Sequence, residues 1–423
     1  MAADEPRLEA VVIGAGQGGL AVSWFLTRLG IGHAVLERSA VAASWRERRW
    51  DSFCTVTPNW SIALPGAEYA GGDPDGFLSR DELVGHFERW AESFDAPLRC
   101  GVEVRAVRPD GDGFAVETGA GVWRAENVVV ATGTYQAPHI PPVAERLPGR
   151  VKQTAADGYK RPGMLAPGGV MVVGAGQTGC QIAEELHEAG RDVWLCVGRA
   201  GRLPRRWRGR DCIAWQRDMG YLDRTPAMLE SPRLRFRADP HLTGRDGGRT
   251  LSLHDFHRRG IRLLGRLVGC DGERARFDGG LHDEMRFADG FCERITAEFD
   301  RHIREQGIDA PPPTAEELAG GPPGDGAMPE VLRELDLAGA SIASAVWAAG
   351  YRYDFSWIEA PVLDEAGYPV APGGVSAWPG LYFTGLNWMT SRKSGILWGV
   401  GDDARSVARH LAGRRRQSTI RSA

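Results

Sequence analysis

Two glycine-rich segments of the same pattern are the residues of this sequence best suited to bind a ligand. Val11-Val-Ile-Gly-Ala-Gly-Gln-Gly-Gly19 recurs later in the chain as Met171-Val-Val-Gly-Ala-Gly-Gln-Thr-Gly179. Such glycines let a backbone turn tightly and approach phosphates, and the helix N-terminus that follows offers free N–H groups to an anion. The repeat therefore predicts two dinucleotide sites, whose pyrophosphate-binding residues are Gly14, Gly16 and Gly19 in the first copy and Gly174, Gly176, Gln177, Thr178 and Gly179 in the second.

The two copies differ at the end of the second strand, where nucleotide specificity is set. The first copy has Glu37, a carboxylate that can hold the hydroxyls of a ribose. The second copy has Val197 followed by Arg199, with Arg205 and Arg206 in a basic cluster just downstream. A carboxylate repels a 2′-phosphate, whereas an arginine binds it through a fork of hydrogen bonds. We therefore expect FAD at the first site and NADPH at the second; a solvated arginine-rich loop is the alternative explanation of the cluster.

Strands and helices must position these motifs. The runs 34–37 and 193–197 follow the two helical patterns, so the order strand, turn, helix, strand occurs twice. The runs 127–133 and 345–350 are strands that end in small residues, and Ser79 with Glu82 forms a capping box before an amphipathic helix. The predicted fold is α/β, with two Rossmann-like dinucleotide-binding domains, the NADPH domain inserted into the FAD domain.

The predicted boundaries follow from the repeat. We expect the first part of the FAD-binding domain at 1–160, the NADPH-binding domain with a helical insertion at 161–335, the return segment of the FAD-binding domain at 336–412, and a disordered basic tail at 413–423.

Composition excludes several classes of protein. The net charge of −4 over 423 residues gives no general attraction to nucleic acid or an acidic membrane, and no apolar run approaches the ~20 residues of a membrane span. The start of the chain lacks a secretory signal, so a cytoplasmic enzyme is expected. The seven cysteines include no CxxC pair, which argues against a zinc site and a redox-active disulfide. His254 and His257 lack a third ligand nearby and are expected to be surface residues, so no metal is predicted.

The sequence resembles the flavin-containing monooxygenases, or class B flavoprotein monooxygenases, over essentially its whole length. The likeness rests on the two fingerprints in FAD-then-NADPH order, on Trp45-Arg46, on the two Ala-x-Gly strand ends, and on Phe383-Thr-Gly-Leu386 and Leu397-Trp-Gly-Val-Gly-Asp-Asp-Ala404. The segment Arg49–Trp60 is similar to a bacterial subgroup of FAD-dependent oxidoreductases often encoded beside a nitrilase. The resemblance implies that the FAD site also includes Arg38, Trp45, Ala131, Thr132, Gly133, Gly385 and Leu397.

The resemblance also implies an activity, the transfer of one oxygen atom from a flavin peroxide to a nitrogen or sulfur of a small molecule, with O2 as co-substrate. Asn59 falls where the family has an asparagine beside the flavin, which implies a catalytic role; an asparagine that caps the turn after Pro58 is the alternative. Trp60, Trp388 and Trp398 lie next to flavin-side motifs and are predicted to line the substrate pocket. No nucleic acid or membrane partner is expected, and a homodimer stays open beside a monomer.

One departure from the family bears on the choice between activities. The family carries Phe-x-Gly-x-x-x-His ahead of the second fingerprint, whereas this chain reads Leu147 to Gln153 and keeps only Gly149. The missing histidine, which contributes to NADP⁺ handling in the family, weighs against Baeyer–Villiger oxygenation of a ketone. The main alternative is a NAD(P)H-dependent flavoprotein reductase or oxidase without oxygen transfer. A flavin-binding scaffold without turnover is disfavoured, because both fingerprints are intact.

Overall fold

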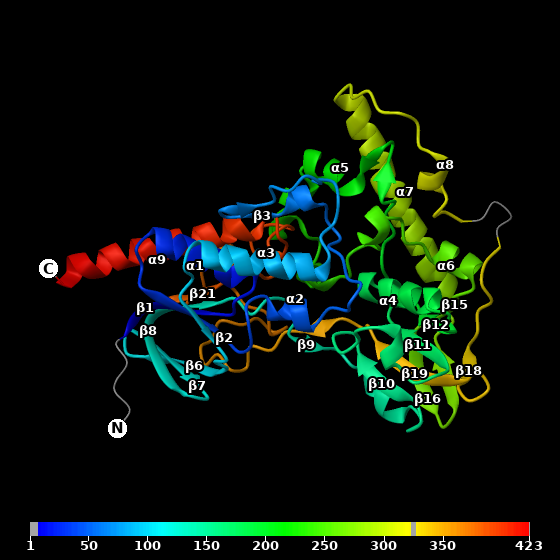
Figure 1. Cartoon of the computed structure of the whole chain (residues 1–423), viewed down its shortest axis with the longest axis horizontal. Helices are drawn as coiled ribbons and strands as arrows, with labels where there is room; N and C mark the ends of the chain where they lie inside the picture. The colour runs from blue at the N-terminus through cyan, green and yellow to red at the C-terminus, as the bar shows by residue number, and fades with distance from the viewer. Residues whose placement is uncertain (1–6, 323–326, 423) are drawn as a thin grey trace.

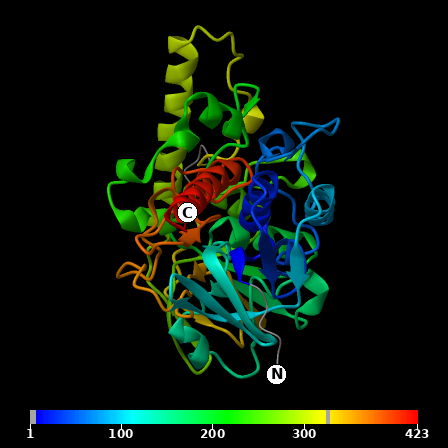
Figure 2. The same ribbon diagram turned by 90° about the vertical axis from the view of Figure 1, so that its left-hand side faces the viewer.

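The computed structural model describes residues 7–322 and 327–422, the last six of these as backbone only (Figure 1). Two units lie side by side, each built on a parallel sheet, and the long helix α7 (Leu281–Glu305) of the second unit rises away from its sheet (Figures 1 and 2). This arrangement confirms the α/β fold predicted from the repeat.

The parallel strands of the two units have the same spatial order. In the first unit the order is β5 (Leu98–Cys100), β2 (His33–Glu37), β1 (Leu8–Ile13), β8 (Gly121–Val130) and β21 (Leu381–Phe383). In the second unit it is β15 (Arg262–Leu264), β12 (Val193–Cys196), β11 (Gly169–Val173), β19 (Ile342–Trp347) and β10 (Lys152–Ala155). The two sheets therefore repeat one topology, although the fifth strand comes last in the chain in the first unit and first in the second.

Each sheet carries an antiparallel extension or neighbour. In the first unit β6 (Val104–Asp110) and β7 (Gly113–Thr118) continue the sheet beyond β8. In the second unit a separate sheet contains β16 (Leu267–Asp271), β17 (Arg274–Phe277) and β18 (Glu334–Asp336). The short pairs are β3 (Ala63–Leu64) with β4 (Ala67–Glu68) and β13 (Arg206–Trp207) with β14 (Arg210–Asp211).

The helices follow the pattern expected from the sequence. The two glycine-rich turns lead into α1 (Gln17–Arg28) and α4 (Gln177–Glu188), and the capping box of Ser79 and Glu82 opens α3 (Arg80–Ser93). The others are α2 (Ala43–Glu47), α5 (Cys212–Asp218), α6 (Leu253–Arg259), α7 (Leu281–Glu305), α8 (Ala315–Leu318) and α9 (Val400–Ser422). Because α9 continues through Ser422, the prediction of a disordered tail is wrong.

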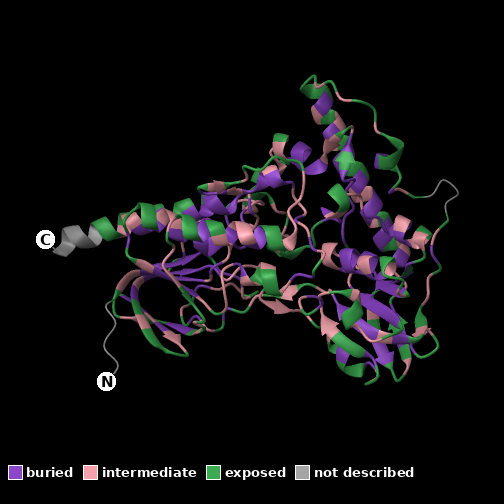
Figure 3. Cartoon of the chain, viewed as in Figure 1, coloured by how far each residue is buried: buried purple, intermediate pink, exposed green. Residues whose placement is uncertain are grey.

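Burial on both faces explains why the central strands are so apolar. Val12 and Val35 pack against α1, α3 and α9, whereas the alternate residues Val11 and Ile13 belong to the core on the other face of the sheet. Figure 3 shows these strands buried in both units. Parallel sheets covered on both faces read as continuous β-branched runs, which is the pattern that predicted them.

The structure moves the predicted domain boundaries. β10 lies before residue 160 and β19 after residue 335, yet both pair within the second sheet. The chain passes between the units at β9 (Ala137–Pro138) and β20 (Tyr351–Arg352), which pair with each other antiparallel. The boundaries therefore fall at this strand pair, and the run 345–350 belongs to the second unit. The small residues at the end of this run did not reveal the unit to which it belongs, because each of the two glycine-rich turns faces a strand that ends in small residues.

Candidate functional site

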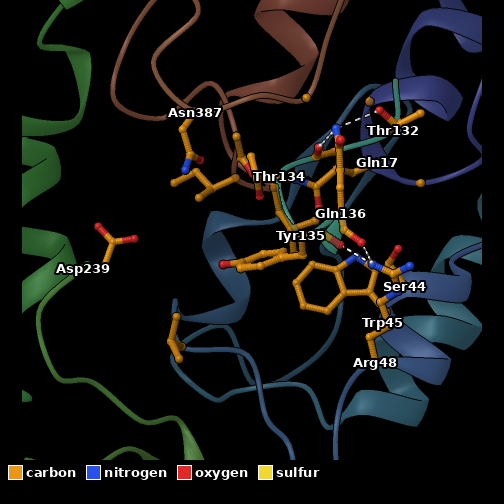
Figure 4. A pocket seen from close by; sticks show the side chains of 18 of the residues that line it. Gln17, Ser44, Trp45, Arg48, Thr132, Thr134, Tyr135, Gln136, Asp239 and Asn387 are labelled. Carbon is orange, nitrogen blue, oxygen red and sulfur yellow. Dashed lines mark hydrogen bonds between the residues drawn. The ribbon is translucent and has the colours of Figure 1, made fainter. Parts of the chain in front are cut away.

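A cavity of about 830 Å³ lies between the two units and is reached by both glycine-rich turns. Gly14, Gly16 and Gln17 line it from the first turn, and Gln177 and Thr178 from the second. Figure 4 shows Trp45 and Tyr135 on the first unit, with Asp239 across the cavity on the second. Each parallel sheet therefore presents the carboxyl ends of its strands to one shared space, the usual place for a ligand in such folds.

Each turn requires glycine because helix and strand nearly touch. Gly14 and Gly174 have φ of +107° and +110°, values that disfavour any side chain. A Cβ at Gly19 would lie far inside van der Waals contact with the carbonyl oxygen of Gly14, and one at Gly179 would meet Gly174 in the same way. The contacts fix the start of each helix against its strand, so its free N–H groups point into the cavity.

Gly16 differs from the other glycines of the first turn. A Cβ built there has no heavy atom within 4 Å, and the backbone φ of −87° suits any residue. The space in front of Gly16 belongs to the cavity, which is where a pyrophosphate would contact the backbone.

Glu37 lies beside the first turn and lines the cavity. Its Oε2 accepts a hydrogen bond from the N–H of Ala15 at 2.9 Å and its Oε1 one from the N–H of Ser39 at 3.0 Å. Each oxygen keeps a second lone pair, so the carboxylate can still accept the hydroxyls of a ribose. The other residues that the resemblance implied at this site all line the same cavity, namely Arg38, Trp45, Ala131, Thr132, Gly133, Gly385 and Leu397. The residues present therefore fit FAD.

The second turn is held by a segment that sequence reasoning missed. Gln177 donates to the carbonyl of Pro240 at 2.8 Å, Gln181 donates to that of Leu242 at 2.6 Å, and His241 Nε2 donates to that of Ala175 at 2.7 Å. Burial lowers the pKa of His241 to about 4. The ring is therefore neutral at physiological pH, with its proton on Nε2, because a carbonyl oxygen can only accept.

The predicted arginines of the second site separate into different environments. Arg205 is 2% exposed, pairs with Asp211 at 2.6 Å and donates to the carbonyl of Val56 at 2.9 Å. Its Nε has no partner but is buried, and Arg205 is not among the residues that line the cavity, so the structure does not bring it to the predicted phosphate site. Arg206 donates to the carbonyls of Gly247 and Gly248, outside the cavity.

Arg199 follows the end of β12, as expected, but like Arg206 it is not among the residues that line the cavity. Its Nε donates to Glu284 at 2.9 Å, its Cζ lies 5.0 Å from the ring centre of Phe287, and its side chain is 54% exposed. Arg237, which the sequence did not indicate, lies 4.7 Å over the same ring and lines the cavity. Phe287 thus brings together two guanidinium groups from distant parts of the chain.

The structure does not support the catalytic role of Asn59. Its side-chain N–H donates to the carbonyl of Asp73 at 2.9 Å, and its Oδ1 accepts from the N–H of Leu78 at 2.9 Å. Asn59 is buried and is not among the residues that line the cavity. Asn59 thus has a structural place, as in the alternative interpretation, although its amide fixes the loop between β4 and α3 rather than the turn after Pro58.

The three predicted pocket tryptophans separate as well. Trp388 lines the cavity with φ of +57°. Trp60 and Trp398 instead pack edge to face, 5.4 Å apart, within the apolar core beside α5 and α7, so their predicted pocket role is wrong. Gln153, which stands where the family has histidine, accepts from the indole of Trp347 at 3.0 Å and lies away from the cavity.

A segment from the second unit, residues 221–239, forms one wall of the cavity and is called the strap below. Its apolar residues Met228, Leu229 and Leu234 line the cavity. The N–H of Arg392 donates to the carbonyl of Arg224 at 2.9 Å, and the Arg392 guanidinium pairs with Asp239 at 2.9 Å. The strap therefore joins the second unit to the return segment of the first. Its irregular short turns carry no periodicity from which it could have been predicted.

Cysteine and histidine chemistry is not found at this cavity. The described residues include all seven cysteines; all are free thiols and none lines the cavity. His254 is buried and bonded to Asp289 at 2.8 Å, which corrects its expected surface position. Within the described ranges, no group of three or more candidate ligands could hold a metal ion, and no helix has the length and apolarity to cross a membrane.

Comparison with known sequences relates the chain to oxidoreductases. The family model for pyridine nucleotide-disulphide oxidoreductases matches residues 11–206. The CzcO-like oxidoreductase of Geobacillus kaustophilus is 31% identical over 400 residues, which cover 94% of this chain and 96% of that protein. The indole-3-pyruvate monooxygenase YUCCA1 of Oryza sativa subsp. japonica is 30% identical over 201 residues, or 44% of this chain and 47% of that protein.

Comparison with solved structures supports the same fold. The flavin-containing monooxygenase from Stenotrophomonas maltophilia superposes over 97% of this chain and 99% of its own, with a TM-score of 0.66 and 17% identity. At this level of identity the likeness concerns the architecture of the two units.

Gly16 and Gly19 give a first prediction, because the two glycines are needed for different reasons. Gly16→Val should fold normally, since its side chain has room in the protein, but it should lose FAD because the side chain fills the pyrophosphate space. Gly19→Ala should destabilise the fold by about 1–3 kcal/mol or more, since its Cβ meets backbone. Flavin absorbance per protein and thermal unfolding measure the two effects.

Gly163→Ala is the matched control, because a Cβ there meets no atom within 4 Å. It should change neither quantity. A Gly16→Val protein that purifies with a full complement of FAD would contradict the assignment of the first turn.

Proposed function

Because the chain belongs to the CzcO-like oxidoreductases of the flavin monooxygenase family, we propose that it transfers one atom of O2 to a nitrogen or sulfur of a small molecule. It is an FAD- and NADPH-dependent enzyme. The observation that supports oxygen transfer most is the shared cavity: both nucleotide turns open into it, the strap forms one wall of it, and no cysteine lines it.

Reduced FAD supplies the chemistry that activates O2, and the chain's own residues supply binding and enclosure. We assign the first turn to FAD, with Gly16 at the pyrophosphate and Glu37 at the ribose. Gly385 and Leu397 of the return segment, with Gln17 and Trp388, then border the flavin end of the cavity. These residues come from the parts of the chain before and after the inserted unit, so both parts are needed to complete the site.

We assign NADPH to the second turn, with Gln177 and Thr178 near its pyrophosphate. The 2′-phosphate is then recognised by Arg199 and Arg237 rather than by Arg205 or Arg206. Arg199 is half-exposed and bonded to Glu284. The same carboxylate also binds Arg266 at 2.6 Å. One carboxylate shared by two guanidinium groups leaves positive charge for a ligand.

The strap supports oxygen transfer over simple electron transfer. An activated oxygen must be kept from water and stray protons until it meets its acceptor. Met228, Leu229 and Leu234 form the apolar part of the wall that the strap provides, whose other lining residues include Arg235 and Arg237. A nitrogen or sulfur compound with an apolar body is the kind of substrate that this part of the wall admits.

A flavoprotein reductase is the second candidate, favoured by the matching disulphide-oxidoreductase family model. A reductase of that kind passes electrons through a pair of thiols close to the flavin. Because the cavity contains no cysteine, its acceptor would have to be an external disulfide or quinone.

Arg199→Ala should weaken NADPH binding about 10- to 150-fold, because one charge-assisted contact to the 2′-phosphate is worth roughly 1.5–3 kcal/mol. NADH, which lacks this phosphate, should bind almost as well as before. Equilibrium titration of both nucleotides measures the effect.

Arg206→Ala is the control on the same arginine-rich segment, and it should leave both affinities unchanged. If Arg199→Ala weakened NADPH and NADH equally, the arginine would have a structural role.

Isotopic labelling tests the reaction itself. Under ¹⁸O2, with NADPH and a series of amines and thioethers, we expect one ¹⁸O atom per product molecule for each NADPH consumed. In H2¹⁸O with ordinary O2 the label should be absent from the product. NADPH consumption that yields hydrogen peroxide alone with every compound, together with rapid reduction of a quinone or disulfide, would establish the reductase instead.

A further inference from the structure

Arg49 lacks the partner that a buried charge normally has. Three arginines of the described chain are buried: Arg202 pairs with Asp289 at 2.9 Å, and Arg205 pairs with Asp211 at 2.6 Å. Arg49 is only 8% exposed, yet among the described residues its guanidinium has neither an ion pair nor a hydrogen-bond acceptor. An uncompensated buried charge is costly, so a binding role accounts for it better than stability does.

Aromatic rings enclose the Arg49 side chain. Its Cζ lies 4.4 Å from the ring centre of Tyr135, 5.3 Å from that of Trp45 and 5.4 Å from that of Phe53. Attraction to the rings stabilises the charge but does not use the five N–H donors of the guanidinium. The enclosure therefore holds the group in place and leaves its donors available.

The remaining exposure of Arg49 faces the shared cavity, which it lines together with Trp45, Phe53 and Tyr135. The neighbouring cations Arg48 and Lys160 are hydrogen-bonded to neutral groups. Arg48 donates to the carbonyls of Tyr135 and Gln136, and Lys160 Nζ donates to backbone carbonyls that include that of Asp157. Carbonyl oxygens bind these cations without cancelling their charge, and the carboxylates of Asp157 and Glu47 interact with Arg48 without pairing with it directly.

We propose that Arg49 is an anion-binding residue of the cavity, which takes a planar or tetrahedral oxyanion, a carboxylate or a phosphate, through the fork of its guanidinium. Two ligands carry such a group: the nicotinamide nucleotide, through its phosphates, and a substrate with a carboxylate. The inference rests on the proposed function only for the identity of these ligands. Anion binding is measured without turnover, so its failure is distinct from a failure of oxygen transfer.

The test compares FAD-loaded wild type with Arg49→Gln, Arg49→Lys and Arg46→Gln. Arg46 is the matched control, since it lies three residues away, pairs with Glu88 and does not line the cavity. Calorimetric titration with NADP⁺ and, separately, with benzoate gives the two dissociation constants. Flavin occupancy and thermal unfolding report whether each variant is folded.

We expect Arg49→Gln to weaken one of the two probes about 10- to 150-fold, while Arg46→Gln leaves both unchanged. Loss of NADP⁺ affinity assigns the anion to the nucleotide, and loss of benzoate affinity alone assigns it to a substrate carboxylate. Lysine keeps the charge without the fork, so Arg49→Lys should weaken the same probe to a smaller extent. If Arg49→Gln does not fold, the affinities of Arg49→Lys for the two probes test the proposal in its place.

Two results would overturn the proposal. Unchanged affinity for both probes in a folded Arg49 variant would make the residue a structural part of the aromatic cluster. Loss of FAD from a folded Arg49→Gln protein would assign the guanidinium to the resident cofactor.

Discussion

The contact between a glycine of each helix and the carbonyl of the preceding turn is the constraint on which the molecule depends. Gly19 lies against the carbonyl oxygen of Gly14, and Gly179 against that of Gly174, with no room for a single additional carbon. Only this proximity lets α1 and α4 begin directly at the strand ends, with their N-termini at the cavity. Phosphate binding thus depends on backbone packing, and the charged residues around it adjust specificity.

The second requirement is that two such turns meet. The chain passes between the units at the paired strands β9 and β20. The strap of residues 221–239 connects the two units a second time. The segment that follows the strap, residues 240–242, is bonded to the second turn and to α4 through Gln177, Gln181 and His241. The wall of the cavity and the nucleotide turn are therefore parts of one hydrogen-bonded structure. A nucleotide bound at this turn would therefore lie close to the residues that hold the strap in place.

Local patterns predicted the parts of this structure that depend on local physics. The fingerprints, the capping box at Ser79 and the strands with small-residue ends are set by backbone geometry within a few residues, and all are present. Glu37 was predicted for the same reason, since strand and turn together determine its position. All residues expected around FAD line the cavity except Gly19, which packs behind it.

The errors concern side chains whose partners are distant in sequence. Arg205 resembles a phosphate ligand in sequence, but its guanidinium is buried away from the cavity, where it binds Asp211 and the carbonyl of Val56. The side chain of Asn59 is hydrogen-bonded to the loop at 73–78, and the ring of Trp60 packs against that of Trp398. Arg49 is the reverse case, since its sequence neighbours do not reveal that its charge has no counter-ion. A residue type shows what a side chain can bind, whereas the tertiary contacts decide whether its binding groups are free.

The proposed chemistry requires that FAD and NADPH meet in one cavity between the two units. The most direct measurement is anaerobic rapid mixing of the FAD-loaded enzyme with NADPH, followed by flavin absorbance and repeated with NADPH deuterated at the nicotinamide carbon that donates hydride. If the two rings meet, hydride passes directly between them, so we expect full bleaching of the flavin at a rate that deuterium lowers. A flavin that stays oxidised, or that bleaches only when a separate electron carrier is added, would contradict it.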